Sequence, residues 1–205
     1  MPGVISTSDD VRRAMGFLSV EATAGLIGRG VLILDPASTL ISPNAVLASD
    51  VVLWPGVVID ADAAGNIEIS AEVILHAGSR IVARSAQVRI AEQAEIGEEG
   101  GFTICADAGV TIVIGARARL MGGGSLSLDN SIGRGAQIIG AIRAQNCRLG
   151  DGESHRDPDP DRRGGVLKGL GVARGLDVPA GHVVQAFGIF ADAPLRRQSE
   201  FHPRP

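Results

Sequence analysis

Residues 90–138 read IAEQAEIGEEGGFTICADAGVTIVIGARARLMGGGSLSLDNSIGRGAQI, and an apolar residue stands at nearly every sixth position. A free α-helix repeats every 3.6 residues and a plain strand every 2, so neither produces this spacing. A six-residue period is typical of a hexapeptide-repeat parallel β-helix, in which coils stack on one another. We expect a large apolar residue at each of these positions to fill the interior of a coil, with Ala108 as the one small exception: Ile90, Ile96, Phe102, Ala108, Ile114, Leu120, Leu126, Ile132 and Ile138.

The alternative is a set of amphipathic helices. It requires apolar residues at i, i+3, i+4 and i+7, and this stretch is too rich in glycine and β-branched residues for helices. Small residues recur in the second and fifth positions of each hexad, where the backbone must bend at a coil corner. The sequence therefore predicts an all-β chain built as a parallel β-helix.

The period extends toward the N-terminus with two phase slips. One register runs from Ile41 to Ile59, a second from Ile69 to Ile81, shifted by four residues, and a third starts at Ile90, shifted by three. Such slips indicate small loops at coil corners, near residues 61–66 and 84–89. Three hexads make one triangular coil, so residues 41–149 supply about six coils.

The two ends differ from the repeat. Ser8, followed by two aspartates, and Ser19 are helix start signals, and Val11, Met15 and Leu18 fall on one helical face. We expect residues 1–30 to form a helical cap, 31–150 the β-helix, 151–165 a polar loop and 166–205 a C-terminal closure and tail. A partner-binding helix is the alternative for the cap. For 166–190, the alternatives are another β coil and a short closing sheet.

Composition limits the class of function. The chain has 205 residues, a net charge of −4 and 3% aromatic residues, with no tyrosine. Nothing in this balance suggests a nucleic-acid partner, and no apolar run is long enough to span a membrane. No leader is evident, so the sequence predicts a cytoplasmic protein. Cys105 and Cys147 are expected on different faces of the coil, as reduced thiols.

A specific resemblance is found at residues 30–60, GVLILDPASTLISPNAVLASDVVLWPGVVID. Gly30, Val31, the Asp35-Pro36 pair, Thr39 and Ile41 resemble the segment that opens the β-helix in bifunctional N-acetylglucosamine-1-phosphate uridyltransferase/glucosamine-1-phosphate acetyltransferases. Trp54-Pro55-Gly56-Val57 resembles that family's aromatic Pro-Gly-Val step. The resemblance covers roughly residues 19–145, and it implies a left-handed β-helix and a homotrimer with ligand grooves between subunits.

The chain also departs from this family. The nucleotidyltransferase domain of that family is absent, and so are the two motif steps that carry acetyl transfer there. No catalytic residue is carried over from the family.

Two histidines are candidates for a general base. An acyltransferase of this fold class typically uses one histidine to take a proton from the acceptor, with acetyl-CoA as possible co-substrate. His155 lies in the polar loop and His76 at a coil corner, and the alternatives are a solvated loop and a surface histidine. His182 and His202 are predicted to be structural or solvent-facing.

Four cations are candidates for anion binding. Arg162 and Arg163 in the polar loop could hold a CoA or sugar phosphate. Lys168, the only lysine, and Arg174 stand among glycines whose N–H groups can approach a phosphate. The order of these residues is not that of a P-loop. The histidine spacing does not suit a zinc-dependent carbonic anhydrase of this fold class, so no metal is predicted.

The leading hypothesis is a hexapeptide-repeat transferase, related to the uridine-diphosphate-N-acetylglucosamine pyrophosphorylases, that moves an acyl group from CoA to a sugar or sugar nucleotide. The alternative is a catalytically inactive trimeric scaffold or regulatory β-helix related to such enzymes. Both rest on the analogy of fold. Polar residues facing the groove would favour the enzyme, and a groove of alanine, serine and valine would favour the scaffold.

Overall fold

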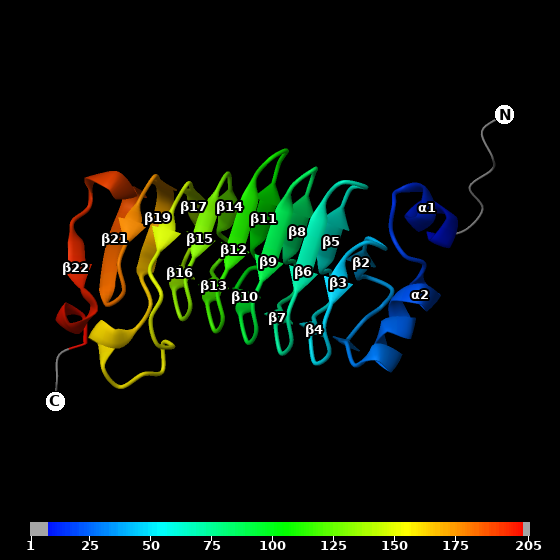
Figure 1. The fold of residues 1–205 in the computed structure, drawn as a ribbon, viewed down its shortest axis with the longest axis horizontal. Coiled ribbons are helices and arrows are strands. Elements are labelled where there is room, and N and C mark those ends of the chain that lie inside the picture. Colours follow the sequence, from blue (N-terminus) through cyan, green and yellow to red (C-terminus); the bar gives the residue numbers. More distant parts are fainter. Residues whose placement is uncertain (1–7, 203–205) are drawn as a thin grey trace.

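The chain is a left-handed parallel β-helix with a short helical cap at its N-terminal end (Figure 1). The structure is a computed structural model, and it describes residues 8–202. Every strand pair in the described chain is parallel except the last, and the coils have three faces. None of the described helices combines the length and apolar character needed to cross a membrane.

The strands of each face lie in neighbouring coils. The first face contains β1 (Leu32–Ile33), β4 (Val52–Leu53), β7 (Ile74–Leu75), β10 (Glu95–Glu98), β13 (Arg119–Met121) and β16 (Gln137–Ile139). The second contains β2 (Leu40–Ile41), β5 (Val58–Ala61), β8 (Arg80–Ala83), β11 (Thr103–Ala106), β14 (Ser125–Ser127) and β17 (Ile142–Gln145). The third contains β3 (Val46–Leu47), β6 (Asn66–Ile69), β9 (Gln87–Ile90), β12 (Thr111–Ile114), β15 (Asn130–Ile132), β18 (Arg148–Leu149) and β20 (Asp177–Val178).

The core is a stack of aliphatic side chains from successive coils. On the first face one interior column is in register throughout and fully buried: Leu53, Leu75, Ile96, Leu120, Ile138 and Leu167. Each such side chain contributes about 1.5–3 kcal/mol by leaving water. Stacking in thin layers explains why the chain needs so few aromatic residues.

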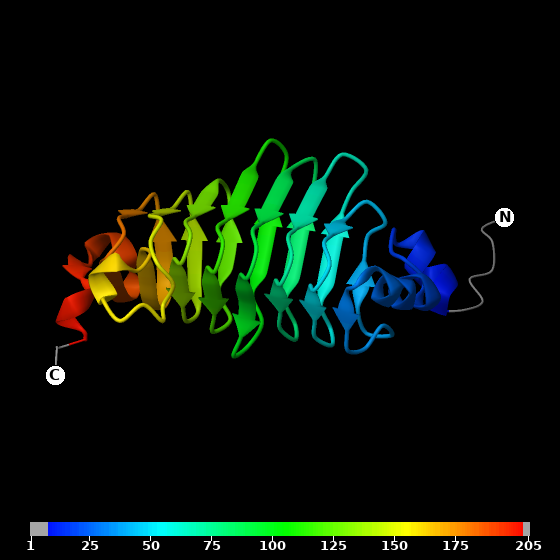
Figure 2. The same cartoon turned by 60° about the horizontal axis from the view of Figure 1, so that its bottom comes forward.

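The two predicted phase slips are confirmed as corner insertions. Leu53 pairs with Leu75 and Leu75 with Ile96, so both of these coils are longer than three hexads. The excess is four residues in the first coil and three in the second, which equals the two slips in the sequence. The added residues form turns between the second and third faces, at 62–65 and 84–86, which stand out along one edge (Figures 1 and 2).

A further pair of insertions corrects the predicted interior. Ile96 pairs with Leu120, so this coil is one whole hexad longer than three, although the six-residue period runs through it unbroken. Extra residues at 97–101 and 107–110 add up to that hexad and therefore conserve the phase. Ile104, paired with Ile81 and Leu126, is the interior residue, and Ala108 is exposed in a turn. Phe102 is buried, but it lies in the corner preceding β11.

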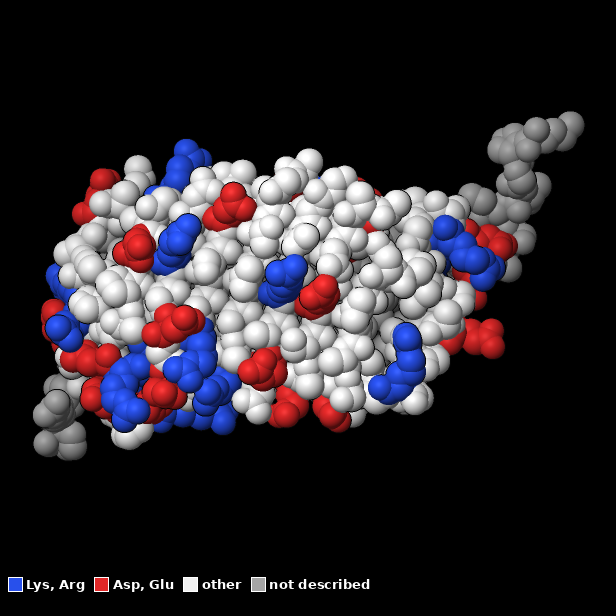
Figure 3. All heavy atoms as spheres, in the orientation of Figure 1, with Lys and Arg blue, Asp and Glu red and all other residues white. Residues whose placement is uncertain are grey.

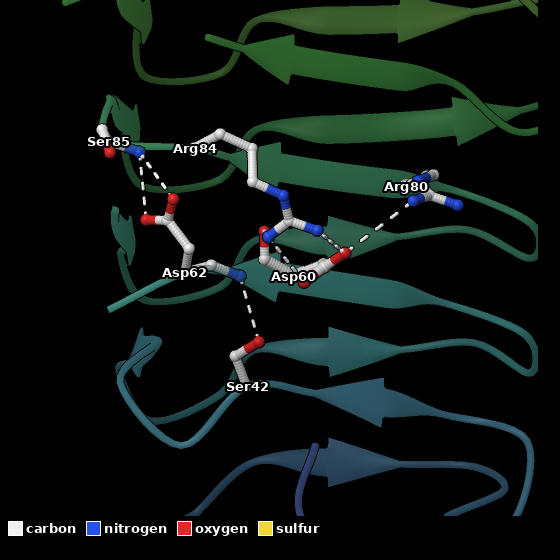
Figure 4. A network of polar contacts seen from close by, with 7 residues as sticks. Ser42, Asp60, Asp62, Arg80, Arg84 and Ser85 are labelled. Carbon is white, nitrogen blue, oxygen red and sulfur yellow. Dashed lines mark hydrogen bonds and ion pairs between the residues drawn. The ribbon is translucent and has the colours of Figure 1, made fainter. Parts of the chain in front are cut away.

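The first two corner insertions are tied together by polar contacts (Figure 4). Arg84 forms a two-pronged ion pair with Asp60, whose side chain is 12% exposed, and this hydrogen bond raises the pKa of Arg84. The Asp62 carboxylate accepts the Ser85 N–H, which lowers the pKa of Asp62. The Ser42 hydroxyl accepts the buried N–H of Ala61 at 3.0 Å. These contacts bind successive coils to one another.

The N-terminal cap consists of α1 (Ser8–Ala14), α2 (Val20–Gly25) and the 3₁₀ turn η1 (Leu26–Arg29). Ser19 caps α2 by accepting the Ala22 N–H, as its residue type predicts. The expected apolar face of α1 is wrong: Val11 and Met15 are exposed. Arg12 is buried in their place, because its guanidinium donates to three carbonyls of residues 36–39.

The C-terminal end both continues and closes the β-helix. β19 (Val166–Arg174) and β21 (His182–Ile189) each run through the first and second faces, and they pair in parallel along most of their length. β22 (Leu195–Arg197) then pairs antiparallel with β21. Short 3₁₀ turns complete the region: η2 (Pro160–Arg162), η3 (Phe190–Asp192) and η4 (Gln198–Glu200). Phe190 is fully buried against the final coil.

Candidate functional site

The polar loop 151–165 is a folded element that is held by its own side chains. Asp157 and Asp159 each accept an N–H two residues further on, as aspartates in turns commonly do. Arg163 donates twice to the Asp157 carbonyl, at 3.0 and 2.7 Å, and pairs with Glu153 in a parallel bridge. These bonds hold the loop at the C-terminal end of the β-helix, where Figure 3 shows acidic and basic side chains gathered.

His155 lies in this loop between two pockets and lines both of them. Its Nδ1 atom is buried and has no hydrogen-bond partner in the described chain. Burial lowers the pKa of His155, and the positive charges of Arg119 and Arg156 lower it further. The imidazole is therefore neutral at pH 7, which is the form that a general base requires.

The first of these hollows, here called the charged pocket, has a volume of about 310 Å³. Arg117 and Arg156 contribute guanidinium groups that make no ion pair or side-chain hydrogen bond with any described residue. Unpaired guanidiniums in a pocket suit an anionic group such as a phosphate. The pocket is lined by Glu72, Ile74, Gln93, Glu95, Arg117, Ala118, Arg119, Ser154, His155 and Arg156.

Arg119 organises the floor of the charged pocket. It forms ion pairs with Glu98 and, at 3.6 Å, with Glu95. The hydrogen bond from Arg119 holds the pKa of Glu98 below its usual value, and His76 and His155 lower it further once they are protonated at acid pH. The two histidines singled out by the sequence thus lie near one carboxylate, although they are far apart along the chain.

The second hollow, here called the apolar pocket, has a volume of about 200 Å³. Ile139, Val166, Val183 and Phe201 supply aliphatic and aromatic walls, and Lys168 is a lining cation that has no ion pair in the described chain. The remaining lining residues are Gln137, His155, Arg163, Gln198 and His202. An apolar pocket with a few polar groups is typical of a small-molecule site.

The structure unites only part of the predicted site. His155, Arg163 and Lys168 lie together at the apolar pocket, whereas Arg162 lines neither pocket. Arg174 lies on the second face, where it donates to the Gln145 side chain at 2.7 and 3.0 Å. The ring of His76 stacks on Trp54.

The other histidines and the cysteines are as follows. His182 is fixed by a 2.8 Å contact between its Nδ1 and the Ala180 carbonyl, and His202 lines the apolar pocket. Both Cys105 and Cys147 are free, as predicted. Residues 8–202 contain no cluster of three or more potential metal ligands among His, Cys, Asp and Glu.

Sequence reasoning missed the charged residues of the first face. Glu95, Glu98, Arg117 and Arg119 occupy ordinary polar positions of the hexads, so nothing in the repeat distinguishes them. The signal that could have found them is the run of glutamates in residues 92–99, followed about one coil later by Arg117 and Arg119.

Comparison with known proteins finds a relative for part of the chain. No protein-family model matches it. The bifunctional protein GlmU of Exiguobacterium sp. (strain ATCC BAA-1283 / AT1b) is 38% identical over 84 residues, covering 35% of this chain and 18% of that protein. The chain thus matches less than one fifth of the length of this relative.

Two solved structures from Caulobacter crescentus are also similar. One is a point mutant of perosamine N-acetyltransferase in complex with CoA and GDP-perosamine, with 19% identity and a TM-score of 0.33, covering 77% of this chain and 56% of that one. The other is PerB in complex with the same two molecules, with 18% identity and a TM-score of 0.32, covering 92% and 66%. The resemblance to the bifunctional uridyltransferase/acetyltransferase family, first indicated by residues 30–60, is confirmed by the GlmU relative for part of its length.

Proposed function

We propose that this chain is an acyltransferase that moves an acyl group from acyl-CoA to an amine or hydroxyl of a sugar nucleotide, with His155 as general base. The observation that carries the proposal is the position of His155: it is neutral, one ring nitrogen has no partner in the described part of the chain, and it lines two pockets of different chemistry. The resemblance to the bifunctional uridyltransferase/acetyltransferases, which the GlmU relative shares, supports the same class of reaction.

The reaction needs one proton carrier. The neutral imidazole takes the proton of the acceptor as its nitrogen or oxygen attacks the thioester carbonyl. The new C–N or C–O bond forms, the C–S bond breaks, and the proton passes from the imidazolium to the departing CoA sulfur. Glu95 and Glu98 neutralise Arg119 nearby, which limits the electrostatic cost of a transient imidazolium.

The two pockets divide the substrates between them. The charged pocket suits the phosphates of the acceptor, because the guanidiniums of Arg117 and Arg156 have no partners among residues 8–202. The apolar pocket suits the acyl end of the donor, with Lys168 placed for a donor phosphate or carboxyl group. Both pockets are open on the first face, and a neighbouring β-helix of a homotrimer would enclose them. The cytoplasmic location remains a prediction.

Polar side chains on the first face favour an enzyme over an inactive scaffold. A surface that served only for assembly would need small or apolar residues, and the charged pocket instead has three carboxylate or amide side chains beside its arginines: Glu72, Gln93 and Glu95.

Release of the CoA thiol tests the proposal. The purified protein is mixed with acetyl-CoA and a panel of amino-sugar nucleotides, and free thiol is measured by a colorimetric reagent. His155→Gln should lower kcat by roughly 10²–10⁴-fold. The control is His182→Gln, whose ring contacts Ala180 outside both pockets and should leave the rate unchanged. Absence of acceptor-dependent thiol release, or an unchanged rate in His155→Gln, would overturn the proposal.

A further inference from the structure

Trp54 and His76 form an aromatic pair on the first face, on the N-terminal side of the charged pocket. Their ring centroids are 5.7 Å apart and their planes are inclined by 24°. His76 covers part of the indole, and Trp54, the only tryptophan in the chain, remains 42% exposed. A large exposed aromatic surface is a typical platform for a flat ligand ring.

The two residues follow the ends of β4 and β7, whereas the charged pocket runs along the starts of β7, β10 and β13 on the same face. The Trp54 N–H donates to Leu75 and the His76 N–H donates to Ile96, so they occupy equivalent positions in consecutive coils. The next coil carries Glu98, and the coil after it carries Arg119. Strands in a sheet are about 4.8 Å apart, so these levels lie about 10 and 14 Å from Trp54.

We propose that Trp54, backed by His76, is the base-binding subsite for the nucleotide part of the acceptor. The base stacks on the exposed indole, and the diphosphate reaches the unpaired guanidiniums of Arg117 and Arg156. The ribose and diphosphate run diagonally from the indole across the first face to the charged pocket. The sugar then lies beside His155. This assignment rests on the proposed function, which it deepens by placing a nucleoside diphosphate on the acceptor.

Charge decides between a nucleotide and a purely apolar occupant. Leu34, in the coil preceding Trp54, is 48% exposed, so the apolar surface alone would also suit a second copy of this chain. A second copy does not account for the two guanidiniums of the charged pocket, which have no partner among the described residues. A nucleoside diphosphate uses both features at once.

Intrinsic fluorescence gives a direct test, because all tryptophan emission comes from Trp54. Titration with uridine, guanosine and adenosine diphosphates should quench the emission, whereas pyrophosphate should bind without quenching. Base stacking is worth roughly 1–3 kcal/mol, so Trp54→Leu should weaken nucleoside diphosphate binding about 5- to 150-fold by calorimetry. Pyrophosphate binding should not change. Phe187→Leu, at an exposed aromatic residue of β21, is the matched control and should bind normally.

Activity separates this inference from the proposed function. In an active enzyme, Trp54→Leu should raise KM for the sugar nucleotide and preserve kcat, whereas His155→Gln lowers kcat. Quenching that is lost in Trp54→Leu supports the base subsite even if no thiol is ever released. Unchanged nucleoside diphosphate affinity in Trp54→Leu overturns it even if transfer is observed. A change of assembly mass in Trp54→Leu by light scattering, without a change in nucleotide affinity, would also overturn it in favour of a subunit contact.

Discussion

The corrected register of the coil between Ile96 and Leu120 can be tested by two substitutions with opposite expectations. The six-residue period places position 108 inside and position 104 outside, and the structure reverses this assignment. Ile104 is fully buried between Ile81 and Leu126. Ile104→Ala removes three carbon groups at about 0.8 kcal/mol each and leaves a cavity in a thin layer. We therefore expect a loss of about 3–4 kcal/mol in the free energy of unfolding.

Ala108→Lys should change the free energy of unfolding by less than about 0.5 kcal/mol, because the side chain enters solvent. Urea unfolding followed by far-ultraviolet circular dichroism measures both variants. With a slope near 2 kcal/mol per molar urea, Ile104→Ala should lower the midpoint by roughly 1.5–2 M. Ile104→Val, which removes one methyl group, should cost about 1 kcal/mol. A large loss in Ala108→Lys together with a near-normal Ile104→Ala would refute the register.

Three further results are expected. The pKa of His155 is lowered, so kcat/KM for transfer should decline only when the pH falls below about 6.5. The neutral ring contributes stability that is complete above pH 6.5 and is lost as the pH falls through the lowered pKa, which urea unfolding at pH 7.5 and 5.5 measures. A His155→Gln protein with the same dependence on pH would contradict this. Asp60→Asn should lower the free energy of unfolding by roughly 1–3 kcal/mol, because it breaks the ion pair with Arg84. Glu68→Gln should lower it by less than about 1 kcal/mol, because the 3.8 Å pair of Glu68 with Arg89 is half-exposed. Equal losses in urea unfolding would show that burial of the Asp60–Arg84 pair is unimportant. Gly140→Ala should lower the free energy of unfolding by roughly 3 kcal/mol or more, since its Cβ would lie 1.9 Å from the Gly169 carbonyl oxygen at a φ of 114°. Gly175→Ala, with open space around it, should lower it by only about 1–2 kcal/mol. Thermal unfolding compares the two variants, and similar midpoints would count against close packing of the corner at Gly140.

The period predicted the fold because the same physical demand recurs in every coil. Where a coil consists of three hexads without an insertion, as from Leu120 to Ile138, the interior position follows directly from the spacing. Insertions of four and three residues break the phase and are therefore visible in the sequence. Insertions that add up to one hexad restore the phase, so the period predicts Ala108 as an interior residue and misses Ile104, whereas Phe102 is buried as predicted, at a corner.

The ends and the site depended on contacts that no period encodes. In α1 the helical pattern favoured Val11 and Met15, yet three backbone carbonyls near residue 37 needed donors, and Arg12 supplied them. His155 was a candidate from the sequence because a polar loop interrupts the repeat. Its neighbours Arg117 and Arg119 could not be predicted, since the direction in which a long polar loop folds depends on its tertiary contacts.

The antiparallel strand β22 has a consequence for the length of the molecule. Each parallel coil exposes the same unpaired backbone N–H and C=O groups as the coil before it, so nothing in the repeat itself ends the stack. Termination is supplied from outside it, by Phe190 beneath the last layer and by β22 along the first half of β21. The pairing of β22 ends at Val184, and beyond it Phe187 and Ile189 remain 75% and 64% exposed. Reversing the direction of one short strand, Leu195–Arg197, thus blocks half of an edge that could otherwise template another chain and leaves the other half as the place where end-to-end growth would begin.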